Sequence, residues 1–254
     1  MASVWITGDI HGDPTRLGSK FWKRFPLTDG KDDNFVIITG DFGLVWAYPC
    51  ESRQENNWLN WLESKNFTTL WCDGNHENFD RIYSSEYPVE EWHGGKVQFI
   101  RPHVIHLMRG EIYDILDAKF FVFGGAQSHD IRDGILDPEK DKEKIKDWNK
   151  RWNVSFRVNH RSWWKEEQPS EAEMQNGLAN LDKAGNKVDF IISHGCPQQV
   201  ASMMGYFETD PISAYFNTIA ETVQFDDWYF GHYHRNETIM CKFHCLYDNI
   251  IRIL

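Results

Sequence analysis

Short runs of apolar residues recur along the chain, and each ends abruptly in a polar motif that contains Gly, Asp or His. The runs are rich in β-branched and aromatic residues. Short continuous apolar runs bounded by glycine are typical of strands that are buried on both faces. We therefore predict strands at Val4–Thr7, Phe35–Thr39, Thr69–Cys72, Phe120–Phe123, Phe190–Ile192 and Trp228–Phe230.

The segments between these runs carry helical patterns. Asn56–Lys65 places its tryptophans and leucines on one side of a helix. Ser170–Lys183 begins with a capping-box pattern, in which Ser170 is followed three residues later by Glu173. Ile212–Val223 is a third helical segment. Strands that alternate with helices indicate an α/β architecture.

Residues 137–152 differ from the rest of the chain because charges of both signs alternate there. The pattern is typical of a solvated helix with ion pairs between residues four apart, and a lid or a dimer contact is the alternative. The chain shows no repeat, low-complexity tract or clear linker. We therefore expect one domain over residues 1–254, with a charged helical insertion around 137–152.

The polar motifs are candidates for a metal site. Motifs that follow successive strands of an α/β sheet gather at the carboxyl edge of the sheet, so residues far apart in sequence meet there. The candidate ligands are Asp9, His11, Asp41, Asn75, His194, His232 and His234. This mixture of imidazole, carboxylate and amide suits Mn, Fe, Zn, Ni or Co better than Ca or Mg. Seven ligands are too many for one tetrahedral zinc ion but suit two ions that share a carboxylate.

Each motif alone is a weak signal, but the ordered set is specific. The series "GDIHG … GDFG … GNHE … SHG … GHYH" resembles the calcineurin-like metallophosphoesterase superfamily, from Gly8 to His234. The resemblance implies an α/β fold, a β-sandwich of two mixed sheets flanked by helices, with a dinuclear metal site at the carboxyl edge of the strands. It assigns one cation to Asp9, His11 and His234. It assigns the other to Asn75, His194 and His232, with Asp41 as the bridge.

The resemblance also implies a chemistry. A hydroxide that bridges two divalent transition-metal ions, with Mn expected first, would attack a phosphodiester or phosphomonoester in line. His76 would assist the leaving group without binding metal, so His76 and Asp41 are the predicted catalytic residues. The second motif reads "GDFGLVW" and not the GDxVDRG of protein Ser/Thr phosphatases. The Asp that orients the catalytic His and the phosphate-binding Arg are therefore missing, which leaves Asp73 and Asp80 as alternative partners of His76.

The stretches "FGGAQSHDIR" and "NHRSWWKEEQPS" resemble a subgroup of small bacterial and phage phosphoesterases. Residues there that could line the substrate side of the cleft are Ser128, His129, Arg132, His160 and Arg161. Trp163 and Trp164 could stack on a base or sugar, although packing in the core is the favoured interpretation.

The composition limits the kinds of binding partner and the cellular compartment that we expect. The formal net charge of −11 repels extended duplex nucleic acid, whereas a small phosphoester, nucleotide-like ones included, remains compatible. The five cysteines are scattered and lack CxxC spacing, which is typical of a reducing compartment. The chain has neither a signal-peptide pattern nor an apolar run of about 20 residues, so we expect a soluble, cytoplasmic protein without membrane contact.

Two other functions remain open from the sequence. The fold could serve as a metal-bound interaction scaffold that has lost catalysis, although the complete ligand set favours an enzyme. A nuclease that acts on single-stranded ends is the other alternative. The oligomeric state is left open.

Overall fold

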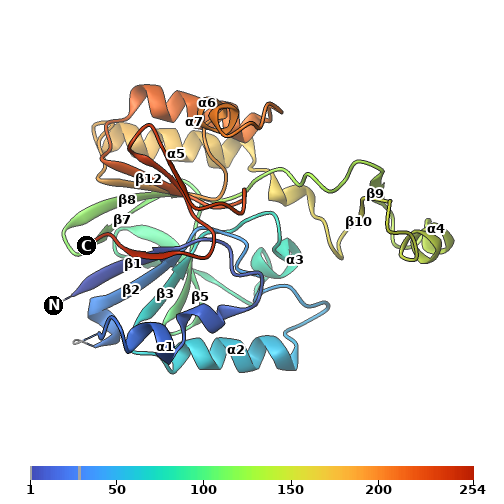
Figure 1. Cartoon of the computed structure of the whole chain (residues 1–254), viewed down its shortest axis with the longest axis horizontal. Coiled ribbons are helices and arrows are strands. Elements are labelled where there is room, and N and C mark those ends of the chain that lie inside the picture. Colours follow the sequence, from blue (N-terminus) through green and yellow to red (C-terminus); the bar gives the residue numbers. More distant parts are fainter. Residues whose placement is uncertain (1, 28–29) are drawn as a thin grey trace.

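The computed structural model describes residues 2–27 and 30–254, and its centre is a pair of β-sheets packed face to face (Figure 1). In sheet order, the strands of the first sheet are β15 (Ile250–Arg252), β1 (Ser3–Thr7), β2 (Asn34–Ile38), β3 (Thr68–Trp71), β6 (Val104–Leu107), β5 (Gly95–Arg101) and β4 (Val89–Trp92). Strands β1, β2, β3 and β6 pair in parallel, whereas β15, β5 and β4 pair antiparallel with their neighbours. The first sheet is therefore mixed.

The second sheet is also mixed. In sheet order, its strands are β13 (Glu237–Ile239), β14 (Phe243–Cys245), β12 (Asp227–Phe230), β11 (Phe190–Ser193), β8 (Ala118–Phe123) and β7 (Glu111–Ile115). The inner strands pair in parallel, and the two edge strands β13 and β7 pair antiparallel. A separate short pair is formed by β9 (Gly134–Leu136) and β10 (Phe156–Val158).

Helices cover the outer faces of both sheets (Figure 1). The first sheet is covered by α1 (Ser19–Trp22) and α2 (Arg53–Glu63), and the second by α5 (Glu171–Lys183), α6 (Gln198–Met203) and α7 (Pro211–Thr222). The remaining helices are α3 (Phe79–Ile82), α4 (Lys142–Trp148) and the short 3-10 turns η1 (Pro14–Leu17), η2 (Lys31–Asp33) and η3 (Lys165–Glu167). This arrangement confirms the predicted α/β sandwich of two mixed sheets flanked by helices.

The side chains of the central strands alternate between two apolar layers. In β1, Val4 and Ile6 belong to the cluster between the sheets, whereas Trp5 packs in the layer under α1 and α2. In β8, Phe120 points between the sheets and Phe121 packs in the layer beneath α5 and α7. Because both faces are covered, the strands need apolar residues at every position. This burial explains the unbroken apolar runs in the sequence.

Each of the six predicted strands is present, as β1, β2, β3, β8, β11 and β12. Helix α5 begins as predicted, with the reciprocal Ser170–Glu173 capping box. Helix α2 begins at Arg53, three residues earlier than the predicted Asn56, because Ser52 and Glu55 form a second capping box. No helix in residues 2–27 and 30–254 has the length and apolarity needed to cross a bilayer.

Between β8 and α5, the chain leaves the body of the protein and returns (Figure 1). We call residues 130–162 of this segment the extension; it carries β9, α4 and β10. Helix α4 is shorter than the predicted helix over 137–152. The start of that stretch forms a turn instead, in which Asp137 accepts hydrogen bonds from the backbone N–H groups of Glu139 and Lys140 at 2.8 and 2.9 Å.

Candidate metal centre

The five polar motifs follow strands that end at a common edge. In the first sheet, Thr7 is aligned with Ile38, and Ile38 with Trp71, so β1, β2 and β3 stop level with one another. In the second sheet, Ile192 of β11 is aligned with Tyr229 of β12. Because the strands within each set are parallel, the residues after them emerge at the same edge. The structure brings the seven predicted ligands together there.

Four of these ligands lie in left-handed backbone conformations. The φ angles are 44° at His11, 45° at Asp41, 66° at His232 and 50° at His234. Few non-glycine residues adopt this region, and such residues cluster at sites where the surrounding structure holds them. The backbone N–H of His11 donates to the carbonyl of Asp41 at 2.8 Å, which joins the turn after β1 to the turn after β2.

Glycines allow the ligands to approach the neighbouring backbone closely. A Cβ atom at Gly74 would lie 2.1 Å from Oδ1 of Asp41, and one at Gly231 would lie 2.1 Å from Oδ1 of Asp9. Both distances are far below van der Waals contact. The glycines of "DGNHE" and "GHYH" are therefore required by the position of the two carboxylates.

Asp9, His11, Asp41 and His234 form the first donor group, in which one ligand atom from each residue lies within 4.8 Å of the others. The Nε2 atoms of His11 and His234 are 3.0 Å apart. Nε2 of His234 also lies 3.3 Å from Oδ2 of Asp9. Imidazole nitrogens and carboxylate oxygens thus face a common point, as ligands of one cation do.

Asn75, His194 and His232 form the second donor group. Oδ1 of Asn75 lies 3.2 Å from Nε2 of His194 and 3.1 Å from Nδ1 of His232. Asp41 lies between the groups, because its Oδ1 is 3.3 Å from Nε2 of His194 and its Oδ2 is 3.8 Å from Nδ1 of His11. Asp41 is therefore the carboxylate that contacts both donor groups.

The electrostatics favour the protonation states that metal ligands need at Asp41, His11 and His232. At His194, burial alone would lower the pKa, but Asp41 and Asp9 outweigh it and raise the pKa, and the hydrogen bond with Asp9 raises that of His234. Burial alone would raise the pKa of Asp41, but the neighbouring imidazoles of His194, His76 and His11 outweigh it and hold this pKa at about 2. Burial lowers the pKa of His11, and burial together with the nearby His194 and His129 lowers that of His232 well below its ordinary value. Asp41 is thus a carboxylate, and His11 and His232 are neutral imidazoles, at neutral pH.

Hydrogen bonds orient the ligands from behind. Nδ1 of the fully buried His194 lies 2.8 Å from the carbonyl of Thr39, which places the ring proton there and leaves Nε2 free to bind metal. The amide Nδ2 of Asn75 donates to the hydroxyl of Ser128 at 3.2 Å, so Oδ1 of Asn75 is the atom left for a cation. Ser128 in turn donates to the carboxylate of Glu167 at 2.6 Å.

Glu77, the last residue of "GNHE", supports the site without facing it. Its buried carboxyl group accepts hydrogen bonds from the backbone N–H groups of Phe42 and Gly43, at 2.7 and 3.3 Å. These bonds fix the turn that carries Asp41. The sequence motif alone does not indicate a role for Glu77, although its position next to His76 is a signal that could have done so.

The backbone N–H of His76 donates to Oδ1 of Asp41 at 2.9 Å, and its ring lies against that of His11, with centroids 5.3 Å apart. Burial lowers the pKa of His76, and so does the charge of Arg157. Nη2 of Arg157, which is in β10 of the extension, lies 3.5 Å from Nε2 of His76. The sequence does not indicate this arginine, because no motif surrounds it.

Neither proposed carboxylate is the partner of His76 among the described residues. Asp73 forms its side-chain bonds with Arg109 and His106. Asp80 bonds instead to His160 and to the indole of Trp164. The structure therefore places an arginine, and neither of these acids, next to the ring of His76.

The residues expected on the substrate side occupy different environments. Ser128 is buried behind Asn75, and Arg161 is exposed. Arg132 is also exposed and pairs with Asp133 within the extension. Of this set, His129 lies at the centre itself, with its Nε2 2.8 Å from Nε2 of His232. Trp164 is fully buried in the layer under the first sheet, which confirms core packing for this tryptophan.

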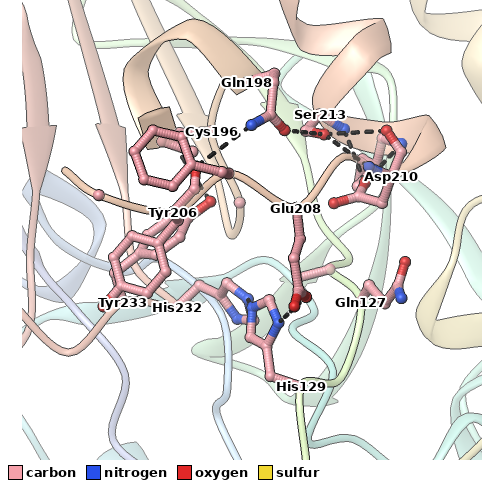
Figure 2. Close-up of a pocket in the computed structure, with 16 residues that line it drawn as sticks. Gln127, His129, Cys196, Gln198, Tyr206, Glu208, Asp210, Ser213, His232 and Tyr233 are labelled. Atoms are coloured by element: carbon pink, nitrogen blue, oxygen red, sulfur yellow. Dashed lines mark hydrogen bonds and ion pairs between the residues drawn. The ribbon is translucent and has the colours of Figure 1, made fainter. Parts of the chain in front are cut away.

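A cavity of about 580 Å³ adjoins the centre on the side of His129 and His232 (Figure 2). Its walls come from the turns after β8, β11 and β12 and from the segment between α6 and α7. A group attached to a phosphate at the metal centre could therefore extend into it. None of these wall residues other than His129 and His232 was predicted as a site residue.

The model of the calcineurin-like phosphoesterase family matches residues 2–236, a range that contains all five polar motifs. No curated protein matches the chain. The match extends from β1 through the turn after β12, and so covers both donor groups.

Proposed function

The chain belongs to the calcineurin-like phosphoesterase family, and from that premise we propose that it hydrolyses a phosphate monoester or diester at a centre of two divalent cations. The family and the buried Asp/His cluster support metal-dependent phosphoester hydrolysis. The proposal of two cations rests on one observation. The two oxygens of Asp41 face different donor groups, at 3.3 Å from His194 and 3.8 Å from His11.

In this proposal, each donor group holds one cation. Asp9, His11 and His234 would bind the first, Asn75, His194 and His232 would bind the second, and Asp41 would belong to both. The imidazole, carboxylate and amide donors favour transition metals, and we expect Mn(II) before Fe, Zn, Ni or Co. Two such cations supply a water of lowered pKa and positive charge for the phosphoryl oxygens in the transition state.

The protein side chains supply the rest of the chemistry. The left-handed turns at His11, Asp41 and His234 fix the donors before substrate arrives, so little reorganisation is needed during the reaction. His76 would hold or deliver a proton at its Nε2 atom for the departing oxygen. Arg157, 3.5 Å from that atom, supplies a positive charge that the second motif lacks.

The proposal is tested by metal-dependent turnover. Metal-depleted protein receives Mn(II), and the hydrolysis of p-nitrophenyl phosphate and bis-p-nitrophenyl phosphate is measured beside the metal content. We expect two bound ions per chain and turnover that disappears on chelation. Asp41→Asn should abolish turnover and weaken metal binding. Asp182→Asn, an exposed change on α5, is the matched control and should keep both properties.

A different metal content would point to another function. One bound ion or none, together with no turnover of any phosphoester in a broad panel, would overturn the hydrolase proposal in favour of an interaction scaffold. Turnover of the panel without metal would equally contradict the role assigned to Asp41.

A further inference from the structure

The cavity beside the metal centre has the size and position of a substrate pocket. Its volume of about 580 Å³ lies within the range of about 300–1,000 Å³ typical of small-molecule sites. It shares His232 with the second donor group, and His129 forms part of the same wall. Figure 2 shows both rings at the base of the pocket, with the other labelled side chains around them.

One wall of the pocket is aromatic. The rings of Tyr206 and Tyr233 contact each other, with centroids 4.7 Å apart and an interplanar angle of 52° (Figure 2). The guanidinium of Arg235 lies 5.3 Å from the centre of the Tyr206 ring and donates to the carbonyl of Met204, which holds the tyrosine in place. Phe207 is 76% exposed where it lines the pocket. These rings offer stacking surfaces for a flat ligand.

The pocket also offers one unused amide. Gln198 is fully engaged, because it donates to the carbonyl of Tyr206 at 3.3 Å and accepts from the hydroxyl of Ser213 at 3.2 Å. Gln127, by contrast, forms no hydrogen bond with any described part of the chain although it lines the pocket. A free amide presents a donor and an acceptor together, which is what the edge of a nucleobase requires.

The charged side chains that line the pocket disfavour anionic groups. Glu208 and Asp210 line it, and among its described lining residues there is no lysine or arginine. Asp210 is occupied as the cap of α7, whereas Glu208 is exposed and lies 3.7 Å from His129. Arg157, whose Nη2 lies 3.5 Å from Nε2 of His76, is not among the residues that line this pocket. A group with further phosphates would thus be repelled from this pocket.

We infer that this pocket binds a nucleoside as the uncharged organic group of the phosphoester. The inference rests on the proposed function, since it assigns the pocket to the same reaction. Stacking on Tyr206 and Phe207 and pairing with the Gln127 amide would select a flat hydrogen-bonding ring. A phosphopeptide or polyphosphate would need the basic side chains that the lining lacks. Trp164 takes no part, because it is buried in the core.

The experiment compares two diesters with the same leaving group in the presence of Mn(II). They are thymidine 5′-(p-nitrophenyl phosphate) and methyl p-nitrophenyl phosphate, which differ only in the nucleoside. We expect kcat/KM for the thymidine ester to exceed that of the methyl ester by about tenfold or more, because stacking of a base on an aromatic side chain contributes a preference of that size. The ratio is internal to each protein sample, so partial unfolding of a variant does not change it.

Variants of the pocket test which residues cause the preference for the thymidine ester. Tyr206→Leu and Gln127→Ala should each lower the ratio toward one. The matched controls, Tyr48→Leu and Gln175→Ala, change exposed residues outside the pocket and should keep the wild-type ratio. A 3′-phosphate added to the thymidine ester should slow its hydrolysis.

Glu208→Lys should reduce the penalty caused by the added 3′-phosphate. Its control, Glu90→Lys on the exposed strand β4, should leave that penalty unchanged. Equal kcat/KM values for the thymidine and methyl esters would overturn the nucleoside inference while the proposed function stands. If neither diester, nor p-nitrophenyl phosphate, nor any other phosphoester of a broad panel is hydrolysed, and the protein holds one metal ion or none, the proposed function is overturned instead.

Discussion

His76 is the side chain whose role can be separated from metal binding. Its backbone N–H holds Asp41, but its ring contacts His11 and Arg157 and belongs to neither donor group. We predict that His76→Ala keeps two metal ions per chain and slows turnover by about 10²–10⁴-fold, the usual worth of general acid catalysis. Elemental analysis and steady-state kinetics check both parts. Undiminished activity would remove His76 from the mechanism.

Arg157 is the residue that we expect to replace the arginine missing from the second motif. Its guanidinium pairs with Asp130 and reaches His76. We predict that Arg157→Ala lowers kcat/KM for phosphoesters by about 10- to 100-fold, the worth of a hydrogen bond to a charged group, without changing the metal content. Arg132→Ala, on the same extension but paired with Asp133, is the comparison. A larger effect at Arg132 would contradict this assignment.

At the scale of elements, the start of α2 depends on one buried carboxylate. Glu55 accepts hydrogen bonds from the backbone N–H groups of Trp46, Ala47 and Ser52 at 2.6, 2.7 and 2.7 Å. It also lies 3.3 Å from the buried guanidinium of Arg81. Glu55 therefore caps α2 and also anchors the loop that follows the motif "GDFG".

We predict that Glu55→Ala lowers the free energy of unfolding by about 3–5 kcal/mol, because three backbone N–H groups lose their acceptor and the buried Arg81 keeps only Glu86 as a carboxylate partner. Ser52→Ala removes only the cap and should cost about 1 kcal/mol. Ser170→Ala at the equivalent position of α5 is the control and should also cost about 1 kcal/mol. Urea unfolding checks the three values. Equal losses for Glu55→Ala and Ser52→Ala would show that Glu55 acts as a cap alone.

The same scale shows why the sequence predicts some elements and not others. Strands such as β1 and β8 can be recognised in the sequence by their continuous apolar runs, because helices and the opposite sheet bury both of their faces. Strand β4 is largely exposed and carries no such run, and β9 and β10 pair only with each other. The ligands were predictable because they follow buried strands directly. The position of Arg157 depends on the path of the whole extension, which no local pattern encodes.

At the scale of the molecule, a buried ion pair connects the two sheets. Asp73 follows β3 of the first sheet, and Arg109 lies in the crossover from β6 to β7 of the second. The Nε atom of Arg109 donates to Asp73 at 2.8 Å. Burial alone would raise the pKa of Asp73, but the charge of Arg109 and the bond with His106 outweigh it and hold this pKa well below its usual range.

The depressed pKa makes this link sensitive to acid. An aspartate has a pKa of about 3.9 in the unfolded chain, so the stabilisation by Asp73 is complete well above that pH and is lost as the pH falls toward the folded value. We predict that Asp73→Asn destabilises metal-depleted protein at neutral pH and that its deficit against the wild type shrinks below about pH 4. Unfolding by urea at several pH values checks this. A deficit that stays constant down to pH 2 would exclude the linkage.

The metal centre should stabilise the whole fold, because its donors come from turns after strands of both sheets. Ligands that bind only the folded state stabilise it by mass action, by about 2.7 kcal/mol at a concentration 100 times Kd. For a chain of this size, that corresponds to a rise in Tm of about 5–10 °C. We predict such a rise when Mn(II) is added to metal-depleted protein, its reversal by chelator, and its near absence in Asp41→Asn but not in Asp182→Asn. An equal rise in all three proteins would mean that the cations act away from Asp41, and the two sheets would then be joined without them.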